Sequence, residues 1–493
     1  MEEKEKNPLI EERKKKFQEQ IKLGEKPFRN DFRVTAVAKE LHRRFDSLEK
    51  EELEKIPDRF AIAGRIMRIN RFGKGLFADV VDTSGKLQIF LQQQVLGDKG
   101  FERAKLLDIG DIVGAVGPLT KTRTGELTMV VERCDLLTKN FKPLPEKWHG
   151  LKDVEIRYRR RYLDLIANPQ TRQIFHKRAK TIKLIRNFLE DRGFIELETP
   201  TMHPIPGGAT AKPFITHHHA LDIDLYLRIA TELYLKRLVV GGFDRVYELG
   251  RVFRNEGVST WHNPEFTLLE FYQAYSTYED LMELTEELFE KLAVEIAGSK
   301  TLEFLGKEVK IEKPFERVRM KDALIKKGGF DPVILSDDKA LESAASTYGD
   351  VKGMSRGEMI FFLYENVVEP HIVGPTFVTG FPVEVSPLSR RSDSDPSIAE
   401  RFELIICGKE FANAFSELND PEDQRARMEE QVAAGGDERP KEVDEDFLMA
   451  LEIGMPPTAG EGIGIDRLMM LLTGSSSIRE VIPFPLLKPE REP

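Results

Sequence analysis

Apolar and polar residues alternate through residues 58–138, which is the period of β-strands with one buried face. The alternation is clear in FAIAGRI, KLQIFLQ and ELTMVV, and the turn-forming stretches NRFGKG, DTSG and TGE separate these runs. The pattern predicts five short strands in a small β-barrel, and an OB-fold has this strand count. We assign residues 58–145 to this domain.

Residues 1–57 predict helices instead. Their apolar stripe is thin, with Ile10, Phe17 and Ile21 at helical spacing, and residues 13–16 form a basic cluster. A solvated helix face is the usual meaning of such a charge run. A basic helix beside an RNA-binding module is the alternative, and this pattern alone leaves both open.

After the barrel, residues 146–168 are expected to form a linker, and residues 169–493 a second, larger domain. A helix is expected at about 170–191, because its apolar positions form one side and Gly193 follows it. The segment FIELETP, residues 194–200, reads as the next strand.

The rest of the chain mixes strands and helices without strict alternation. Strands are expected at 246–256 and 265–275, and a hairpin at 402–418 with its turn at Gly408-Lys409. This order predicts a mostly antiparallel sheet with flanking helices, so the fold class is α+β. We expect a largely helical insertion at about 277–372 and a surface loop at 430–444.

Composition narrows the classes of function. The chain has 493 residues and a net charge of −10, which argues against a broadly basic nucleic-acid binder but leaves room for a local basic face. The two cysteines, Cys134 and Cys407, form no CxxC metal site or disulfide framework, as is typical of a cytoplasmic protein. No signal peptide and no membrane-spanning run is expected.

Three segments carry candidate chemistry, while the GxxxxGK[ST] and GxGxxG nucleotide motifs are absent. GEGIGIDR, residues 460–467, alternates glycines along a strand, which opens one face to close approach. FRNEGVSTWHNPEFTLLEFY, residues 253–272, is expected to place Arg254 with Glu256, and Phe266 with Glu270 and Tyr272, on shared strand faces. In the hairpin, a turn at Gly408-Lys409 puts Glu403 opposite Ala414, and its two glutamates suit Mg²⁺.

These segments resemble a known family. FIELETP, FRNE…H…F…E and GEGIGIDR resemble, in this order, the three signature motifs of class II aminoacyl-tRNA synthetases, and the barrel is typical of the lysine, aspartate and asparagine subgroup. PGGATAKPF, LRIATELYLKRL, ANAFSELND and PPTAGEGIGIDR are similar to bacterial-type lysyl-tRNA synthetases. The resemblance covers roughly residues 58–490. It implies ATP-dependent attachment of L-lysine to tRNA(Lys) through a lysyl-adenylate, with Mg²⁺ in an uncertain number of ions, by a cytoplasmic homodimer.

The resemblance also implies residue roles. Arg254 and Arg467 would be catalytic, and ATP would be bound by Arg254, Glu256, His262, Asn263, Phe266 and Arg467. Lysine would be bound by Gly208, Glu232, Glu270, Tyr272, Asn413, Phe415 and Glu417. Mg²⁺ would be held by Glu403 and Glu410, and the anticodon by Phe77, Gln88 and Glu126. Trp261 stands where this family often has a basic residue.

Several points stay open. Simple alternation places Asn413, Phe415 and Glu417 on the strand face opposite Glu410, so a bulge or a strong twist is needed if all four serve one cavity. The alternative function is a non-catalytic or regulatory RNA-binding paralogue on the same scaffold. Specificity for asparagine or aspartate is not what two cavity carboxylates, Glu270 and Glu417, indicate, because these groups suit a cationic side chain.

Overall fold

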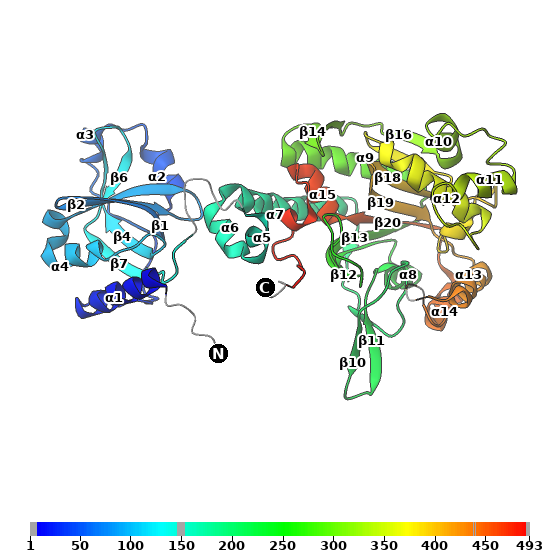
Figure 1. Ribbon diagram of the computed structural model, residues 1–493, viewed down its shortest axis with the longest axis horizontal. Helices are drawn as coiled ribbons and strands as arrows, with labels where there is room; N and C mark the ends of the chain where they lie inside the picture. Colours follow the sequence, from blue (N-terminus) through cyan, green and yellow to red (C-terminus); the bar gives the residue numbers. More distant parts are fainter. Residues whose placement is uncertain (1–6, 145–152, 437, 439, 490–493) are drawn as a thin grey trace. The chain divides into compact units, whose positions relative to one another are not determined.

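The computed structural model describes residues 7–144, 153–436, 438 and 440–489. The chain divides into two compact units, Met1–Leu151 and Lys152–Pro493 (Figure 1). The last residue of the expected barrel domain, 145, and the first seven of the expected linker, 146–152, lie outside the described residues, and 153–168 contain two short helices. None of the described helices is long and apolar enough to cross a membrane.

Unit 1 is an OB-type barrel whose strands form one sheet in the order β5-β6-β3-β2-β1-β4-β7. Seven strands are present where the sequence predicted five, because the last part of the barrel is split into short pieces. The elements are α1 (Pro8–Lys22), α2 (Ala38–Phe45), α3 (Lys50–Leu53), β1 (Phe60–Phe72), β2 (Gly75–Val81), β3 (Lys86–Gln92), α4 (Gln93–Lys105), β4 (Ile112–Gly117), β5 (Leu119–Lys121), β6 (Leu127–Val130) and β7 (Arg133–Thr138).

Helix α1 lies on the barrel partly through the expected apolar stripe, since Phe17 packs against the barrel core. Ile21 is exposed, whereas Gln20 is buried and the Phe17 ring packs against Phe28 and Phe141. The basic cluster also turns inward in part, since the Lys16 ammonium pairs with Asp108 at 2.8 Å. Long polar side chains can bury their stems beneath a polar end, which explains how Gln20 and Lys16 share this contact while Ile21 stays outside it.

Unit 2 is built on an eight-stranded sheet in the order β16-β17-β18-β19-β20-β13-β12-β8, with parallel pairs only at its two edges. Its first elements are α5 (Val154–Arg159), α6 (Arg161–Ala167), α7 (Pro169–Glu190), β8 (Ile195–Glu196), β9 (Met202–His203), β10 (Ile215–His218), β11 (Ile223–Leu227), α8 (Glu232–Val240), β12 (Arg245–Phe253), β13 (Glu265–Ala274), α9 (Tyr278–Leu292), η2 (Ala293–Ala297), β14 (Thr301–Phe304), β15 (Lys307–Lys310) and β16 (Glu316–Arg319).

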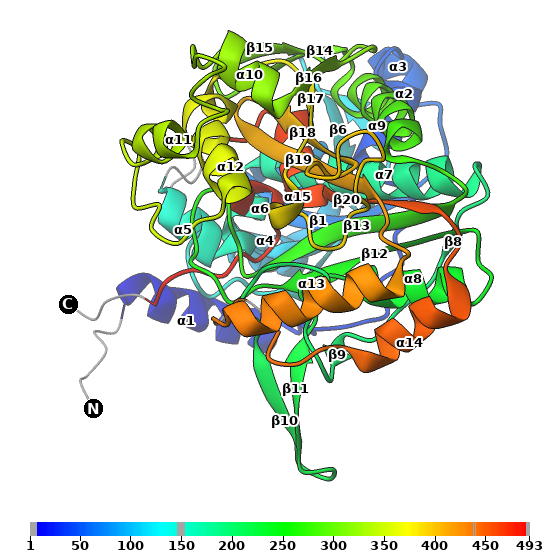
Figure 2. The ribbon, with the colours of Figure 1, turned by 90° about the vertical axis from the view of Figure 1, so that its right-hand side faces the viewer.

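The remaining elements complete the sheet and its helical layers: α10 (Met320–Lys326), α11 (Asp338–Ala345), α12 (Arg356–Val367), η3 (Glu369–His371), β17 (Thr376–Thr379), η4 (Val383–Val385), β18 (Arg401–Ile406), β19 (Lys409–Ser416), α13 (Pro421–Ala434), α14 (Glu445–Gly454), β20 (Thr458–Gly464), α15 (Ile465–Thr473) and α16 (Ile478–Val481). The β10–β11 hairpin extends away from the rest of the unit (Figure 2).

Two expectations need correction. Residues 277–372 are not simply helical, because β14 to β16 lie there and β16 joins the main sheet beside β17. Residues 430–434 belong to α13 and not to a loop, since Asp420 caps that helix and Pro421 occupies its first turn.

The main core explains how the sheet presents a functional face. Alternate residues of β13, including Leu269 and Phe271, are fully buried in a cluster with residues of α7, α9 and α15. Because strand side chains alternate between faces, Glu270 and Tyr272 point to the other side. Helices cover one face of these central strands, and the cavities described next lie on the opposite face.

Candidate active site

Two adjoining cavities lie on this face, with volumes of about 320 and 110 Å³. Residues Arg254, Leu268, Glu410 and Gly462 line both of them and so form a common wall. The larger cavity contains most residues expected to bind lysine, and the smaller one contains those expected to bind ATP. The arrangement places a cavity for each of two reactants side by side.

The glycines of β20 open the floor of the larger cavity. A Cβ atom on Gly460 would stand 2.3 Å from both Glu417 Oε1 and Tyr272 Cε1, so no side chain fits there. At Gly462 the nearest atom, Glu270 Cγ, would be 3.8 Å away. The close approach expected from the GEGIG pattern is therefore present at Gly460. At Gly462 the absence of a side chain instead leaves open space.

The expected face of β13 is formed as the spacing predicted. Phe266 lines the smaller cavity, and Glu270 and Tyr272 line the larger one. One Glu270 oxygen accepts a hydrogen bond from the Thr231 backbone N–H at 2.5 Å and another from the Thr231 hydroxyl. Burial raises the pKa of Glu270 to about 7, so this carboxyl responds to pH near neutrality.

The β18–β19 hairpin differs from the simple expectation in a way that completes the site. Its turn is Cys407-Gly408, with φ of 51° and 66°, because Ile406 pairs with Lys409. Phe411 is the extra residue of a bulge, since Leu404 pairs with Ala412 but Ile405 pairs with Glu410. Glu403 therefore lies opposite Asn413 and not Ala414, and the bulge lets Glu410, Asn413 and Phe415 line one cavity.

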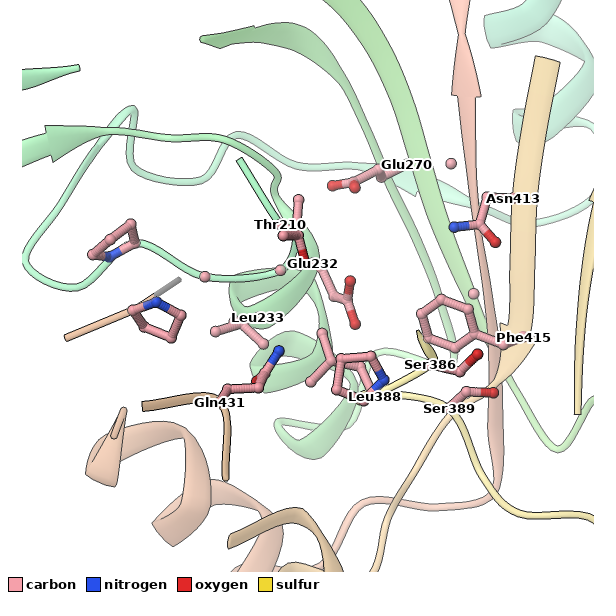
Figure 3. Close-up of a pocket in the computed structure, with 18 of the residues that line it drawn as sticks. Thr210, Glu232, Leu233, Glu270, Ser386, Leu388, Ser389, Asn413, Phe415 and Gln431 are labelled. Carbon is pink, nitrogen blue, oxygen red and sulfur yellow. The ribbon is translucent and has the colours of Figure 1, made fainter. Parts of the chain in front are cut away.

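Side chains from three elements, two of them acidic, surround the larger cavity. Figure 3 shows Glu232 of α8, Glu270 of β13, and Asn413 and Phe415 of β19 around one space. Gly208, with φ of 84°, lies against Ala230 and Glu232, where a Cβ atom would stand 3.0 Å from each of their Cβ atoms. Glu417 lies behind this lining, 2 % exposed, next to Gly460.

Sequence reasoning missed a buried cation beneath the cavity. Lys236 is fully buried, and its ammonium pairs with Glu232 at 2.6 Å and with Glu417. Its Nζ also lies 5.5 Å from the centre of the Phe415 ring. The i,i+4 spacing of Glu232 and Lys236 on a helix was a visible signal, but that spacing is most often a surface pair.

Cations and an aromatic ring face the smaller cavity. The Arg254 guanidinium lies 5.2 Å from the centre of the Phe266 ring. Arg467, in the first turn of α15, donates to the Glu410 carbonyl at 2.8 Å and lies 3.5 Å from His262 Nε2. Partial burial and the Arg467 charge lower the pKa of His262, which favours the neutral ring.

Three details of this segment differ from expectation or extend it. Arg254 and Glu256 lie in the loop after β12 and do not share a strand face, because β12 ends at Phe253. Both still line the smaller cavity. The Asn263 amide is held by backbone groups, donating to the Glu265 carbonyl at 2.5 Å and accepting from the Leu486 N–H at 3.1 Å.

The two glutamates expected to bind Mg²⁺ suit that ion chemically. Burial raises the pKa of Glu403 to about 8, with Glu410 and Glu369 adding to the rise, so a cation would relieve unfavourable charge there. Mg²⁺ takes one or two protein carboxylates and completes its shell with water and phosphate oxygens. Among the described residues no group of three or more acidic, histidine or cysteine side chains is placed to hold a metal by itself.

Two charged residues that organise the site were not among the expected site residues, although one of them, Asp466, lies within the GEGIGIDR segment. Arg401 donates to Glu403 at 2.5 Å and to the Asn413 side chain at 3.0 Å, and so joins the expected metal and lysine sites. Asp466 accepts from the Thr267 N–H at 2.7 Å and from Arg178 of α7 at 2.6 Å, which fixes the start of α15. Contacts of this kind depend on partners far apart in sequence.

Trp261 lines the smaller cavity at the position where a basic residue was the family expectation. The Lys409 ammonium lies 5.3 Å from the centre of its ring, and the ring also packs edge-on against Phe304. The indole therefore holds a lysine from the hairpin turn beside the cavity, so positive charge is present there from another element.

The barrel places the three expected anticodon residues on β2, on β3 and in the loop just before β6. Phe77 is partly exposed and stacks on Phe90, with ring centres 4.2 Å apart. Gln88 donates to Glu126 at 3.1 Å and accepts from the Thr128 hydroxyl at 2.9 Å. An exposed aromatic ring beside an amide and a carboxylate can stack an unpaired base and read its edge.

Comparisons with known proteins agree with this geometry. The family model described as tRNA synthetases class II (D, K and N) matches residues 153–488, and a model of the OB-fold nucleic acid binding domain matches residues 60–137. A lysine–tRNA ligase of Moorella thermoacetica is 50% identical over 491 residues, covering 99% of each chain. Lysine–tRNA ligases of Syntrophomonas wolfei and Oceanobacillus iheyensis are 51% and 49% identical, covering 97% and 98% of this chain and 96% and 99% of their own.

Proposed function

Because the chain belongs to the class II tRNA synthetases (D, K and N), and within them to the lysine–tRNA ligases, we propose that its two cavities bind L-lysine and ATP and join them as lysyl-adenylate for transfer to tRNA. The observation that carries the residue assignments is the set of three buried carboxylates at the larger cavity, Glu232, Glu270 and Glu417, next to the Arg254 wall. Buried carboxylates require cations, and lysine supplies two ammonium groups.

In the larger cavity, each end of lysine meets complementary groups. Glu232 and the Gly208 backbone receive the α-ammonium, and Asn413 receives the α-carboxylate. Glu270, Tyr272 and Glu417 surround the ε-ammonium, while Phe415 packs on the aliphatic stem. Two carboxylates and a phenol can accept the three N–H donors of that ammonium.

In the smaller cavity, Phe266 packs against the adenine, and Glu256, His262 and Asn263 complete the nucleotide contacts. Arg467 holds the far end of the triphosphate. Arg254 lies in the shared wall, where its planar fork reaches both the lysine carboxylate and the α-phosphate.

Positioning and charge neutralisation drive the first step. A lysine carboxylate oxygen attacks the α-phosphorus in line, the bond to the β-phosphate oxygen breaks, and pyrophosphate leaves. Arg254 and Arg467 stabilise the charge that develops on the phosphate oxygens. When bound at Glu403 and Glu410, Mg²⁺ supplies further neutralisation of the triphosphate. In the second step a hydroxyl of the terminal tRNA ribose takes the lysyl group, and AMP leaves.

The remaining parts of the proposal concern partners. Phe77, Gln88 and Glu126 bind the anticodon of tRNA(Lys). The protein acts as a homodimer through β8 and the segment before it, and works in the cytoplasm. Exposed apolar side chains on this side of unit 2, among them Ile195 and Met202, support a subunit interface.

The test is ATP–pyrophosphate exchange with lysine, asparagine or aspartate as the only amino acid. We expect exchange with lysine alone, because the two shorter amino acids carry no side-chain cation and would leave Glu270 without a cation and Glu417 with Lys236 alone. Exchange with asparagine or aspartate would contradict the lysine assignment. No exchange with any amino acid, together with tRNA binding, would favour the regulatory paralogue.

A further inference from the structure

The larger cavity has three buried carboxylates but one cation within ion-pair distance of them in the described part of the chain. Glu232, Glu270 and Glu417 are each at most 7 % exposed, and of the cations in the described part of the chain only Lys236 lies within ion-pair distance of any of them. The nearest arginines serve other groups. Arg401 bonds to Glu403 and Asn413, and Arg254 faces Phe266.

Lys236 uses only one oxygen of each partner. Its ammonium takes Oε1 of Glu232 and Oε2 of Glu417. Apart from this ion pair, no group among the described residues donates a hydrogen bond to either Glu417 oxygen. Glu417 Oε1 lies close to Gly460, where a side chain would collide with it and with Tyr272. A fully buried carboxylate oxygen in this state calls for a donor from a ligand.

We propose that Lys236 is a positioning and specificity residue that brings the cluster of Glu232, Glu270 and Glu417 to a charge of minus two when all three carboxylates are ionised. L-lysine carries two ammonium groups, which match those two charges once its binding has favoured the ionised form of Glu270. The same ammonium ties Glu232, at the α-ammonium end, to Glu417, at the ε-ammonium end, and so fixes the distance over which the substrate must fit. This inference rests on the proposed function.

Electrostatics around the cavity agree with that role. Burial raises the pKa of Glu232 and of Glu417, whereas the Lys236 charge lowers both. Burial disfavours the Lys236 ammonium, but Glu232 and Glu417 outweigh it and raise the pKa of Lys236. Lys236 thus opposes the rise in pKa that burial causes at both acids, and so favours their ionised forms.

The charge balance gives a test with an unusual expected result. Glu417→Gln alone leaves the cavity at minus one and should raise the KM for lysine in pyrophosphate exchange by tenfold or more. Adding Lys236→Met restores a charge of minus two. The KM for lysine of the double variant should therefore be at least about threefold lower than that of Glu417→Gln alone. The KM for ATP should stay within about twofold in both variants. A merely structural lysine predicts the reverse, with the double variant worse than Glu417→Gln.

A matched control exists in unit 1. Lys139 is also fully buried between two carboxylates, Asp108 and Asp111, at 2.7 and 3.0 Å. Lys139→Met should lower the melting temperature of the full-length protein, as loss of a buried cation does, but leave the KM for lysine unchanged. The single variant Lys236→Met should raise the KM for lysine. Lys236→Arg keeps the positive charge, so its KM should lie between those of Lys236→Met and the wild type.

The outcomes separate the two proposals. Lysine-dependent exchange in the wild type with no recovery in the double variant would overturn the role of Lys236 alone. Absence of lysine-dependent exchange in the wild type would overturn the proposed function, and this inference with it. The double variant replaces a buried ion pair by neutral side chains of similar size, so the test does not depend on the folding of Lys236→Met.

Discussion

At the scale of single residues, Arg254 has the most demanding position, because it belongs to the wall of both cavities. Arg254→Ala removes the only guanidinium there and should reduce lysine-dependent pyrophosphate exchange at least about 100-fold, since charge developing on the α-phosphate loses its partner. The fold should survive, as judged by circular dichroism and melting temperature. Exchange near the wild-type rate in the purified variant would remove Arg254 from the chemistry.

Glu270 should make lysine binding depend on pH. Burial raises its pKa to about 7, above its value in the unfolded chain, so ionisation destabilises the empty protein as pH rises towards and past 7. Only the ionised form pairs with the ammonium. Lysine affinity should therefore strengthen, by up to about tenfold per unit, as pH rises towards 7, and the melting-temperature increase caused by lysine should grow over the same interval.

Glu270→Gln keeps the shape and removes the charge. It should lower lysine affinity by about 3 kcal/mol and flatten the pH dependence, with little change in ATP affinity. Calorimetric titration of lysine at a series of pH values measures both effects. An unchanged affinity and pH profile in this variant would place the ε-ammonium elsewhere.

At the scale of elements, the spacing of glycines on β20 allows a paired comparison. In Gly460→Ala the new methyl would stand 2.3 Å from two buried groups, so the free energy of unfolding should fall by about 1–3 kcal/mol. In Gly462→Ala the nearest atom is 3.8 Å away, so stability should change little while the methyl narrows both cavities. Denaturant unfolding without ligand distinguishes the two, and equal losses would contradict this account of the strand.

The elements also show what the sequence could and could not predict. Even spacing along β13 was sufficient to place Glu270 and Tyr272 together, because strand alternation is a local property. The register of the β18–β19 hairpin was not predictable, since the bulge at Phe411 depends on how that ring packs in the core. Arg401 and Lys236 were missed for a related reason: their partners are known only once the strands and helices are assembled.

At the scale of the whole molecule, the barrel and the larger unit should carry separable tasks. Phe77→Ala and Gln88→Ala should each weaken aminoacylation of tRNA by about 1–3 kcal/mol, because a stacking surface or a base contact is lost. Pyrophosphate exchange without tRNA should stay nearly intact. Phe28→Ala, which removes an exposed ring that packs on α1, is the control and should leave both assays unchanged. Equal damage to both assays would mean that Phe77 and Gln88 hold the barrel together.

Assembly is the second property at this scale. Ile195 of β8 exposes about half of its side chain, which supports the proposed subunit interface at that strand. Sedimentation at micromolar concentration should give the mass of a dimer. An active monomer under these conditions would refute the assignment, and Ile195→Asp should shift the equilibrium towards monomer if it holds.

The wall common to the two cavities has a thermodynamic meaning. The side of the wall that each ligand meets is formed by the same residues, Arg254, Leu268, Glu410 and Gly462. Whichever ligand binds second therefore meets a surface that the first has already ordered or displaced. Whatever the factor by which bound lysine changes the affinity for the nucleotide, reciprocity requires the nucleotide to change lysine affinity by the same factor. A substitution in the wall therefore alters both dissociation constants and the coupling between them, whereas a substitution that changes one constant alone identifies a residue outside it.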